Sequence, residues 1–225
     1  MIVILLTAVG ALVGHTLSAP ASGVAVASHA TASIPDSVTK PQSPNPGYGP
    51  ESGMMEMHFS DMGDMVITTW FTGHGARTAN YSSATFAGVT LTTVSIVSDG
   101  WSIQYDTASR RGTRRPVDSN NSEFGQASLG SFARIENLSA SDRKKWKVKP
   151  LRSRTLLGRK TRGIQFEVSG MVMKAWHWQN IPLRIEMYMG GPEPMVVTVT
   201  KLKTDITVPE DLFRVPSDIT LSTGE

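Results

Sequence analysis

The sequence predicts a mainly β chain of the α+β class, and three observations support this. Leu183, Ile185 and Met187 alternate with polar residues, as on a half-buried strand. Asp99-Gly100 between two alternating segments is a strong hairpin signal. Short segments of this kind, separated by Gly, Asn and Asp, recur from Met54 onward. We therefore expect an antiparallel sheet rather than a helical bundle.

The chain begins with an apolar run, Ile2 to Val13, that is shorter than the roughly 20 residues needed to span a bilayer. This run is typical of an export signal, so residues 1–32 are interpreted as a signal peptide or N-terminal apolar leader. Residues 33–53 are rich in Pro, Ser and Gly, which predicts a linker. One folded domain is expected over residues 54–220. There is no cysteine, which excludes disulfides and the lipid-attachment cysteine of a lipobox lipoprotein.

The first strands are expected within Met55 to Phe71, with a break near residues 61–64, and at Val89 to Val97. The hairpin partner begins at Trp101. The alternation fades from Ser122 to Val148, where Ser139 precedes a charged segment and one or two helices are predicted. The later strands are expected at about 151–157, 163–169, 171–179, 182–189 and 194–203, followed by a helical turn over 209–213.

Charge is unevenly distributed along the chain. Residues 110–162 hold fifteen Lys or Arg against four Asp or Glu, a local excess of +11, which leaves −8 elsewhere against the total of +3. This region is either a solvated basic surface or a docking site for anionic lipid headgroups or an acidic envelope protein. Nucleic acid is not expected, because aromatic residues are not interleaved with the basic run.

Catalytic and metal-binding patterns are weak. There is no His-Glu-x-x-His and no Gly-x-Ser-x-Gly, so a non-enzymatic protein without a cofactor is expected. Five methionines and a histidine lie between Met54 and Met65, and thioether ligands suit Cu(I). A copper site at Met54, Met57, His58 and Met62 is therefore kept as an alternative to apolar packing by flexible methionines.

Several motifs, in their order and spacing, resemble the LolA/LolB-like superfamily of outer-membrane lipoprotein-sorting proteins, in a branch of secreted bacterial domains of unknown function. They are Gly73–Arg77, Ser98–Asp106, Gly158–Gly163, Trp176-x-Trp178, Ile181–Glu186 and Val208–Pro216. The resemblance implies a strongly curved antiparallel sheet, an unclosed half-barrel, with helices covering its concave side and a cavity for acyl chains.

The resemblance also suggests which side chains meet a ligand. The candidate cavity residues are Trp70, Trp101, Tyr105, Trp176, Trp178, Leu183, Ile185 and Met187, with Arg77 near the rim. The resulting hypothesis is an exported periplasmic or secreted protein that holds a lipid or lipoprotein acyl chain. The alternative is a structural or interaction domain of the envelope whose closed core binds nothing and which docks through its basic face.

Overall fold

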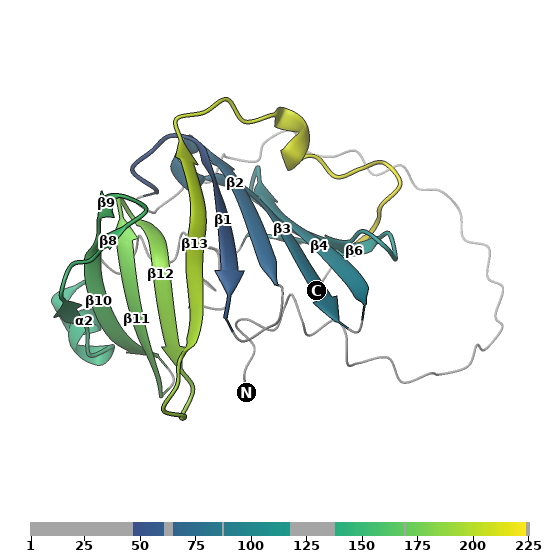
Figure 1. Ribbon diagram of the computed structural model, residues 1–225. Coiled ribbons are helices and arrows are strands. Elements are labelled where there is room, and N and C mark those ends of the chain that lie inside the picture. Colours follow the sequence, from purple (N-terminus) through teal and green to yellow (C-terminus); the bar gives the residue numbers. More distant parts are fainter. Residues whose placement is uncertain (1–46, 61–64, 87, 118–137, 169, 224–225) are drawn as a thin grey trace.

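The computed structural model describes residues 47–60, 65–86, 88–117, 138–168 and 170–223 (Figure 1). The predicted leader and most of the predicted linker lie outside this part of the chain. The strands of the large sheet are β1 (Gly53–Phe59), β2 (Val66–Thr72), β3 (Arg77–Phe86), β4 (Val89–Ser98), β5 (Trp101–Asp106), β6 (Arg111–Pro116), β7 (Lys149–Leu151), β10 (Arg162–Val168), β11 (Met171–Trp178), β12 (Ile181–Tyr188), β13 (Met195–Thr204) and β14 (Thr220–Thr223).

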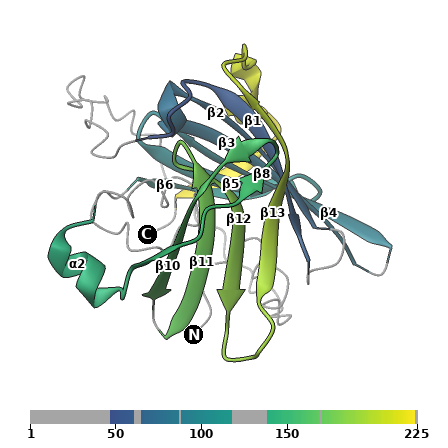
Figure 2. The ribbon, with the colours of Figure 1, turned by 60° about the vertical axis from the view of Figure 1, so that its left-hand side comes forward.

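These twelve strands follow one another across the sheet in the order β14-β6-β5-β4-β3-β2-β1-β13-β12-β11-β10-β7. Every pair is antiparallel except β14 with β6. Two further strands, β8 (Thr155–Leu156) and β9 (Arg159–Lys160), form a separate small hairpin. The prediction of a mainly β, strongly curved sheet that does not close into a barrel is confirmed (Figure 2).

Two tight turns explain how neighbouring strands are joined. Asp99 and Gly100 both have positive φ, 53° and 79°, the backbone of a type I′ hairpin turn, as the sequence predicts between β4 and β5. Gln179 and Asn180, with φ of 47° and 65°, make the equivalent turn between β11 and β12. The second turn therefore precedes Ile181, which lies between the two strands expected from the sequence but is the first residue of β12.

The curvature of the sheet is seen at one of its ends, where two turns approach each other. Gly49 donates a backbone hydrogen bond to Gln179, while its neighbour Tyr48 donates one to His74 in the β2–β3 turn, η2 (Gly73–Gly75). Along the sheet, β2 and β12 are three strand spacings apart, about 14 Å. Tyr48 and Gly49 can bond to the β2–β3 and β11–β12 turns at the same time only because the sheet is curved at this end. Tyr48 lies on the concave side.

Helix contributes little to the described residues. The predicted helical segment contains α2 (Ala140–Lys145), whose N-cap is Ser139: its hydroxyl accepts a hydrogen bond from the Asp142 amide at 3.1 Å. This helix stands beside the sheet (Figure 1). The short η3 (Glu210–Phe213) packs on the outer face, against β3 and β4. Helices over the concave side, which the resemblance implies, are not shown in the described ranges, and residues 118–137 lie outside them.

Candidate functional site

Buried residues on the inner face form an apolar wall that runs from β10 to β2. Cross-strand pairing places Met187 beside Met173 and Met195, and Ile185 beside Ala175 and Val197. The buried members of this wall, here called the inner wall, are Met55, Met57, Phe59, Phe71, Phe166, Ala175, Leu183, Ile185, Met187, Val197 and Val199. Flexible thioethers are thus concentrated on this face, and such side chains suit an adaptable apolar surface.

One end of the inner wall is closed by residues 47–52, here called the strap. Tyr48 is 3% exposed, and its ring meets that of Phe71 edge-on at 4.8 Å. Asn180 Nδ2 donates a hydrogen bond to the Gly47 carbonyl at 3.0 Å, and the Ser52 hydroxyl donates to the Ile206 carbonyl at 2.7 Å. These residues belong to the segment that the sequence predicts to be a linker. In the structure they contact β2, the β11–β12 turn and the residues that follow β13.

The inner face changes character in β3 to β5. Pairing aligns Ser82 with Thr93, and Asn80 with Ser95 and then Gln104. The Thr69 hydroxyl donates a hydrogen bond of 2.7 Å to Asn80 Oδ1 and links this polar stripe to the inner wall. The concave face is therefore amphipathic, with an apolar wall beside hydroxyl and amide groups and, at the end of β5, the carboxylate of Asp106. Sequence alternation does not reveal these polar residues as candidates, because the alternation leaves open which face of a strand is concave.

On the outer face of β2 to β5 the apolar side chains are covered by the C-terminal segment, residues 205–219. Val208 and Phe213 pack there with Ala79, Val94 and Ile96. The Tyr81 hydroxyl donates a hydrogen bond of 3.2 Å to the Leu212 carbonyl. This segment runs from the end of β13, inside the sheet, to β14 at one edge of the sheet (Figure 1).

Four of the nine candidate cavity residues lie on this outer face. Trp70 and Tyr105 pack in it, and Trp101 shares their face, with the Arg114 guanidinium 3.7 Å from its ring. Arg77 binds both carboxylate oxygens of Glu210, at 3.1 and 2.8 Å, and lies over Phe213. The structure therefore separates these four residues from the concave face.

The other five candidates lie in β11 and β12. Leu183, Ile185 and Met187 are buried members of the inner wall. Trp176 points outward, donates a hydrogen bond of 3.0 Å to the Arg152 carbonyl and is covered by the Arg154 guanidinium at 3.8 Å. Trp178, at the end of β11, packs against the inner wall and has the Arg159 guanidinium 3.9 Å from its ring.

A bulge in β12 explains why the two tryptophans have different surroundings. Trp176 pairs with Arg184, but its neighbour His177 pairs with Pro182, so Leu183 has no partner in β11. Proline has no amide hydrogen to offer the ladder, and a bulge is a usual place for it within a sheet. The simple alternation that places Trp176 and Trp178 on one face does not account for this irregularity.

The methionine and histidine cluster is divided by the strand geometry. Met57 belongs to the inner wall, whereas its neighbour His58 is exposed on the other face, 3.4 Å from a Glu56 oxygen. Met54 lies on the same side as His58, and Met62 is outside the described residues. Met57 and His58 therefore point to opposite faces. In the described part of the chain no group of three or more His, Cys, Asp or Glu side chains is placed to hold a metal ion.

The comparisons with known proteins concern the fold. No protein-family model matches this chain, and no curated protein is similar to it in sequence. An uncharacterised conserved protein from Thermus thermophilus matches 78% of this chain and 92% of its own, with a TM-score of 0.55 and 8% identity. This likeness shows that the curved sheet is shared.

Two weaker similarities come from solved structures. A chain of the Pseudomonas aeruginosa MucA/MucB complex matches 77% of this chain and 58% of its own, with a TM-score of 0.48 and 11% identity. A domain from Vibrio parahaemolyticus, named for outer membrane lipoprotein sorting, matches 75% and 91%, with a TM-score of 0.32 and 15% identity.

Proposed function

We propose that this protein is an exported, non-enzymatic binding domain that holds a lipidic or otherwise apolar ligand against the concave face of its half-barrel. The observation that supports this proposal most strongly is the inner wall itself. Three of its buried members are methionines, Met55, Met57 and Met187, and a fourth, Met65, which precedes β2, packs in the same cluster with aromatic and branched side chains. Such a surface adapts its shape to acyl chains of different lengths.

The amphipathic concave face gives the ligand an orientation. An acyl chain lies on the inner wall from β10 to β2, while the hydroxyl and amide groups of β3 to β5 face a less apolar part of the ligand. The proposal includes helices that cover the ligand on the concave side, as the resemblance to lipoprotein-sorting proteins implies. Among the described residues, no helix is long and apolar enough to cross a membrane.

The proposal is tested on protein purified from an exporting host. Native mass spectrometry followed by lipid extraction is expected to find a bound lipid, and the delipidated protein is expected to bind a fluorescent fatty acid. A protein that carries no lipid and does not bind the fatty acid contradicts the proposal. It then favours the alternative, an envelope interaction domain that docks through its basic face, for which a salt-sensitive pull-down is the measurement.

A matched pair of variants locates the binding surface. Val172 and Met173 are neighbours in β11, both partly buried, and they face opposite sides of the sheet. Met173→Lys places a charge on the inner face, whereas Val172→Lys places the same charge outside. Met173→Lys is expected to weaken fatty-acid binding by about tenfold or more, because an unpaired charge is costly beside an acyl chain. Equal affinities in two folded variants would exclude the inner face as the site.

A further inference from the structure

The small hairpin made by β8 and β9 ends in a turn that displays a large apolar side chain. Leu156 pairs with Arg159, which leaves only Leu157 and Gly158 for the turn. Their φ angles are 49° and 70°, as in a type I′ turn. The side chain at the tip, Leu157, is 45% exposed. The hairpin thus presents a leucine to the surroundings of the protein.

Leu157 is also an exception among the residues with a left-handed backbone. In the described ranges eight non-glycine residues have positive φ, and Leu157 is the only apolar one. The equivalent turns hold Asp99 and Gln179 at this position. A bulky apolar side chain is strained in this conformation, and here it gains no full burial in return. A contact outside the chain would account for the choice of leucine.

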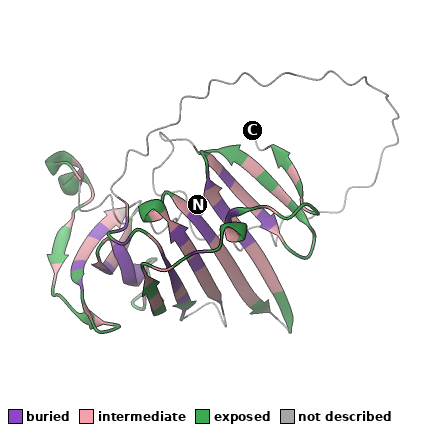
Figure 3. Cartoon of the chain, turned by 90° about the horizontal axis from the view of Figure 1, so that it is seen from above, coloured by how far each residue is buried: buried purple, intermediate pink, exposed green. Residues whose placement is uncertain are grey.

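The hairpin belongs to the most basic part of the protein. Residues 138–162, here called the basic edge, contain α2, β7 and the hairpin, and β7 is the last strand at one edge of the sheet (Figure 1). They include ten Lys or Arg and a single acidic residue, Asp142, a local excess of +9. Helix α2 has no buried residue and is largely exposed (Figure 3). This edge therefore carries a strong positive potential.

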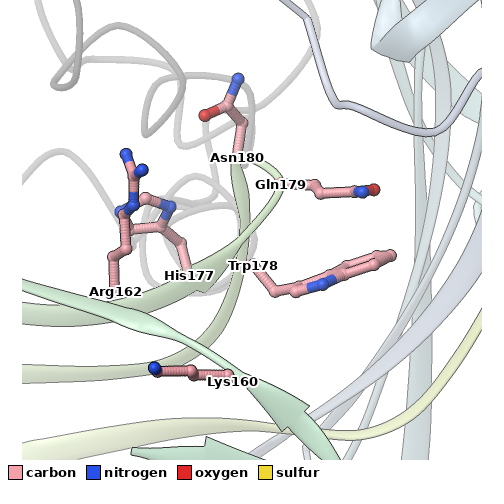
Figure 4. A pocket seen from close by; sticks show the side chains of 6 residues that line it. All are labelled: Lys160, Arg162, His177, Trp178, Gln179 and Asn180. Atoms are coloured by element: carbon pink, nitrogen blue, oxygen red, sulfur yellow. The ribbon is translucent and has the colours of Figure 1, made fainter. Parts of the chain in front are cut away.

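Much of this charge is not neutralised within the chain. Lys147 is bound to Glu167 at 2.8 Å. Figure 4 shows the Lys160 ammonium directed away from the Arg162 guanidinium, so the charges do not gather around one small anion. Spread charges instead attract an extended anionic surface through their summed field. The exposed cations that form no ion pair within the described part of the chain are Lys144, Lys145, Lys149, Arg152 and Lys160.

Contacts at its base hold the hairpin in place. Leu156 packs against the inner wall, and the Arg159 guanidinium lies 3.9 Å from the centre of the Trp178 ring. The amide and the hydroxyl of Thr161 both donate hydrogen bonds to the Arg154 carbonyl, at 2.9 and 2.7 Å. The tip is therefore presented by fixed strands, and little conformational entropy is lost when it makes a contact.

We propose that the basic edge docks on the surface of a bilayer that contains anionic lipids, with Leu157 inserted among the headgroups. Apolar burial and attraction to anionic lipid add together when an apolar side chain is displayed between cations. Lys160 follows the turn on one side, and Arg152 precedes the hairpin on the other. This docking surface lies outside the concave face and does not depend on the ligand proposed above.

Vesicle flotation measures the docking. The protein is expected to bind vesicles of phosphatidylglycerol and phosphatidylcholine about tenfold or more tightly than vesicles of phosphatidylcholine alone, and the difference should shrink as salt rises. Arg152→Gln with Lys160→Gln is expected to weaken binding to the anionic vesicles about tenfold. The matched control, Lys201→Gln with Lys203→Gln, removes the same charge from exposed positions of β13, inside the sheet, and should bind as the wild type does. Circular dichroism checks that both variants are folded.

A dye at the tip tests the insertion. The chain has no cysteine, so Leu157→Cys can be labelled at one position with the environment-sensitive dye NBD. Its emission is expected to shift to the blue on anionic vesicles. The same dye on Val89→Cys, a residue 60% exposed at the start of β4, should not shift. Leu157→Asn suits the left-handed backbone and is expected to weaken vesicle binding about fivefold, whereas Val89→Asn is not.

The outcomes are distinguishable. Equal binding to both kinds of vesicle, or equal effects of the two double variants, refutes docking through the basic edge. An unshifted dye at position 157, with unchanged binding by Leu157→Asn, refutes insertion into a bilayer, and the basic edge then fits an acidic protein. Fatty-acid binding is measured without vesicles, and Leu157→Asn should bind the fatty acid as the wild type does. Failure of either proposal therefore leaves the other standing.

Discussion

Arg77 and Glu210 form a two-pronged ion pair between β3 and the C-terminal segment, 133 residues apart in the chain. The pair fastens the segment that covers the outer apolar cluster, and the Arg77 guanidinium also lies 4.5 Å from the centre of the Phe213 ring. The sequence resemblance suggests a role for Arg77 at the rim of a ligand cavity. In the structure the planar guanidinium of Arg77 instead forms a bidentate pair with the carboxylate of Glu210.

The first prediction concerns the acid stability of this clamp. The hydrogen bond from Arg77 holds the pKa of Glu210 below its ordinary value of 4.5. The stabilisation is therefore present above that value and is lost as pH falls through the lowered pKa. Glu210→Gln is expected to flatten the pH dependence of urea unfolding on the acid side of about pH 4.5. The exposed Glu193→Gln is the control, and an unchanged acid limb in Glu210→Gln would contradict the role of the pair.

The second prediction concerns the strap. Tyr48→Ala removes a buried ring that packs on Phe71 and is expected to lower the free energy of unfolding by about 3 kcal/mol. Tyr48→Phe keeps the ring and should cost much less. Denaturant unfolding followed by tryptophan fluorescence measures both. Equal stabilities of the alanine variant and the wild type would show that the strap does not hold the end of the half-barrel together.

The same tyrosine gives a third, alkaline prediction. Burial raises the pKa of the Tyr48 phenol above its ordinary value of 10.0. The folded state thus favours the neutral phenol, and its contribution to stability is present below pH 10 and lost as pH rises further. The difference in stability between wild type and Tyr48→Phe is expected to change only at alkaline pH, where the wild type loses stability and the variant does not lose this contribution. A parallel decline of both proteins would assign the alkaline loss to other groups.

The fourth prediction concerns the outward Trp176. Trp176→Phe loses the hydrogen bond to the Arg152 carbonyl and part of the stacking under Arg154. The free energy of local opening of residues 152–160, which contain β8 and β9, is therefore expected to fall by about 1–2 kcal/mol. Hydrogen exchange should rise locally over residues 152–160. Trp101→Phe, which is stacked by Arg114 in another part of the sheet, is the control and should leave that exchange unchanged.

The fifth prediction tests how closely the sheet packs beside that tryptophan. A Cβ on Gly163 would lie 2.8 Å from Trp176 Nε1 and 2.9 Å from Leu151 Cβ. Gly163→Ala is therefore expected to destabilise the protein by about 1–3 kcal/mol, because the contacts must shift to admit a methyl group. Gly191→Ala, with no atom within 4 Å of its added Cβ, provides the comparison. Thermal unfolding of the two variants measures the difference.

The sequence predicts most elements because their signals are local. The Asp99-Gly100 turn and the alternation of Leu183, Ile185 and Met187 depend only on neighbouring residues, and the structure confirms both. Which side chains of a strand point to the concave side of the sheet depends on contacts with residues far away in the sequence. Trp70 and Tyr105 alternate as regularly as Ile185, yet the C-terminal segment covers their face on the outer side. No pattern within β2 or β5 contains that information.

Irregular pairing limits the sequence prediction in a second way. The bulge at Leu183 gives Trp176 and Trp178 different environments, although they are two residues apart. Long-range pairing limits it as well, since Arg162 is visible in the sequence only as part of a long cationic region. Its position beside His177 is produced by the ladder between β10 and β11.

The two ends of the strand order have a consequence for solubility. An open sheet of this size exposes two rows of backbone groups that could template the addition of another chain, a common route to aggregation. At one edge stands β14, only four residues long, which pairs in parallel with β6. At the other stands β7, three residues long, with Pro150 at its centre, where no amide hydrogen is available. The half-barrel therefore stays unclosed without a long free edge at which a second copy could add its strands.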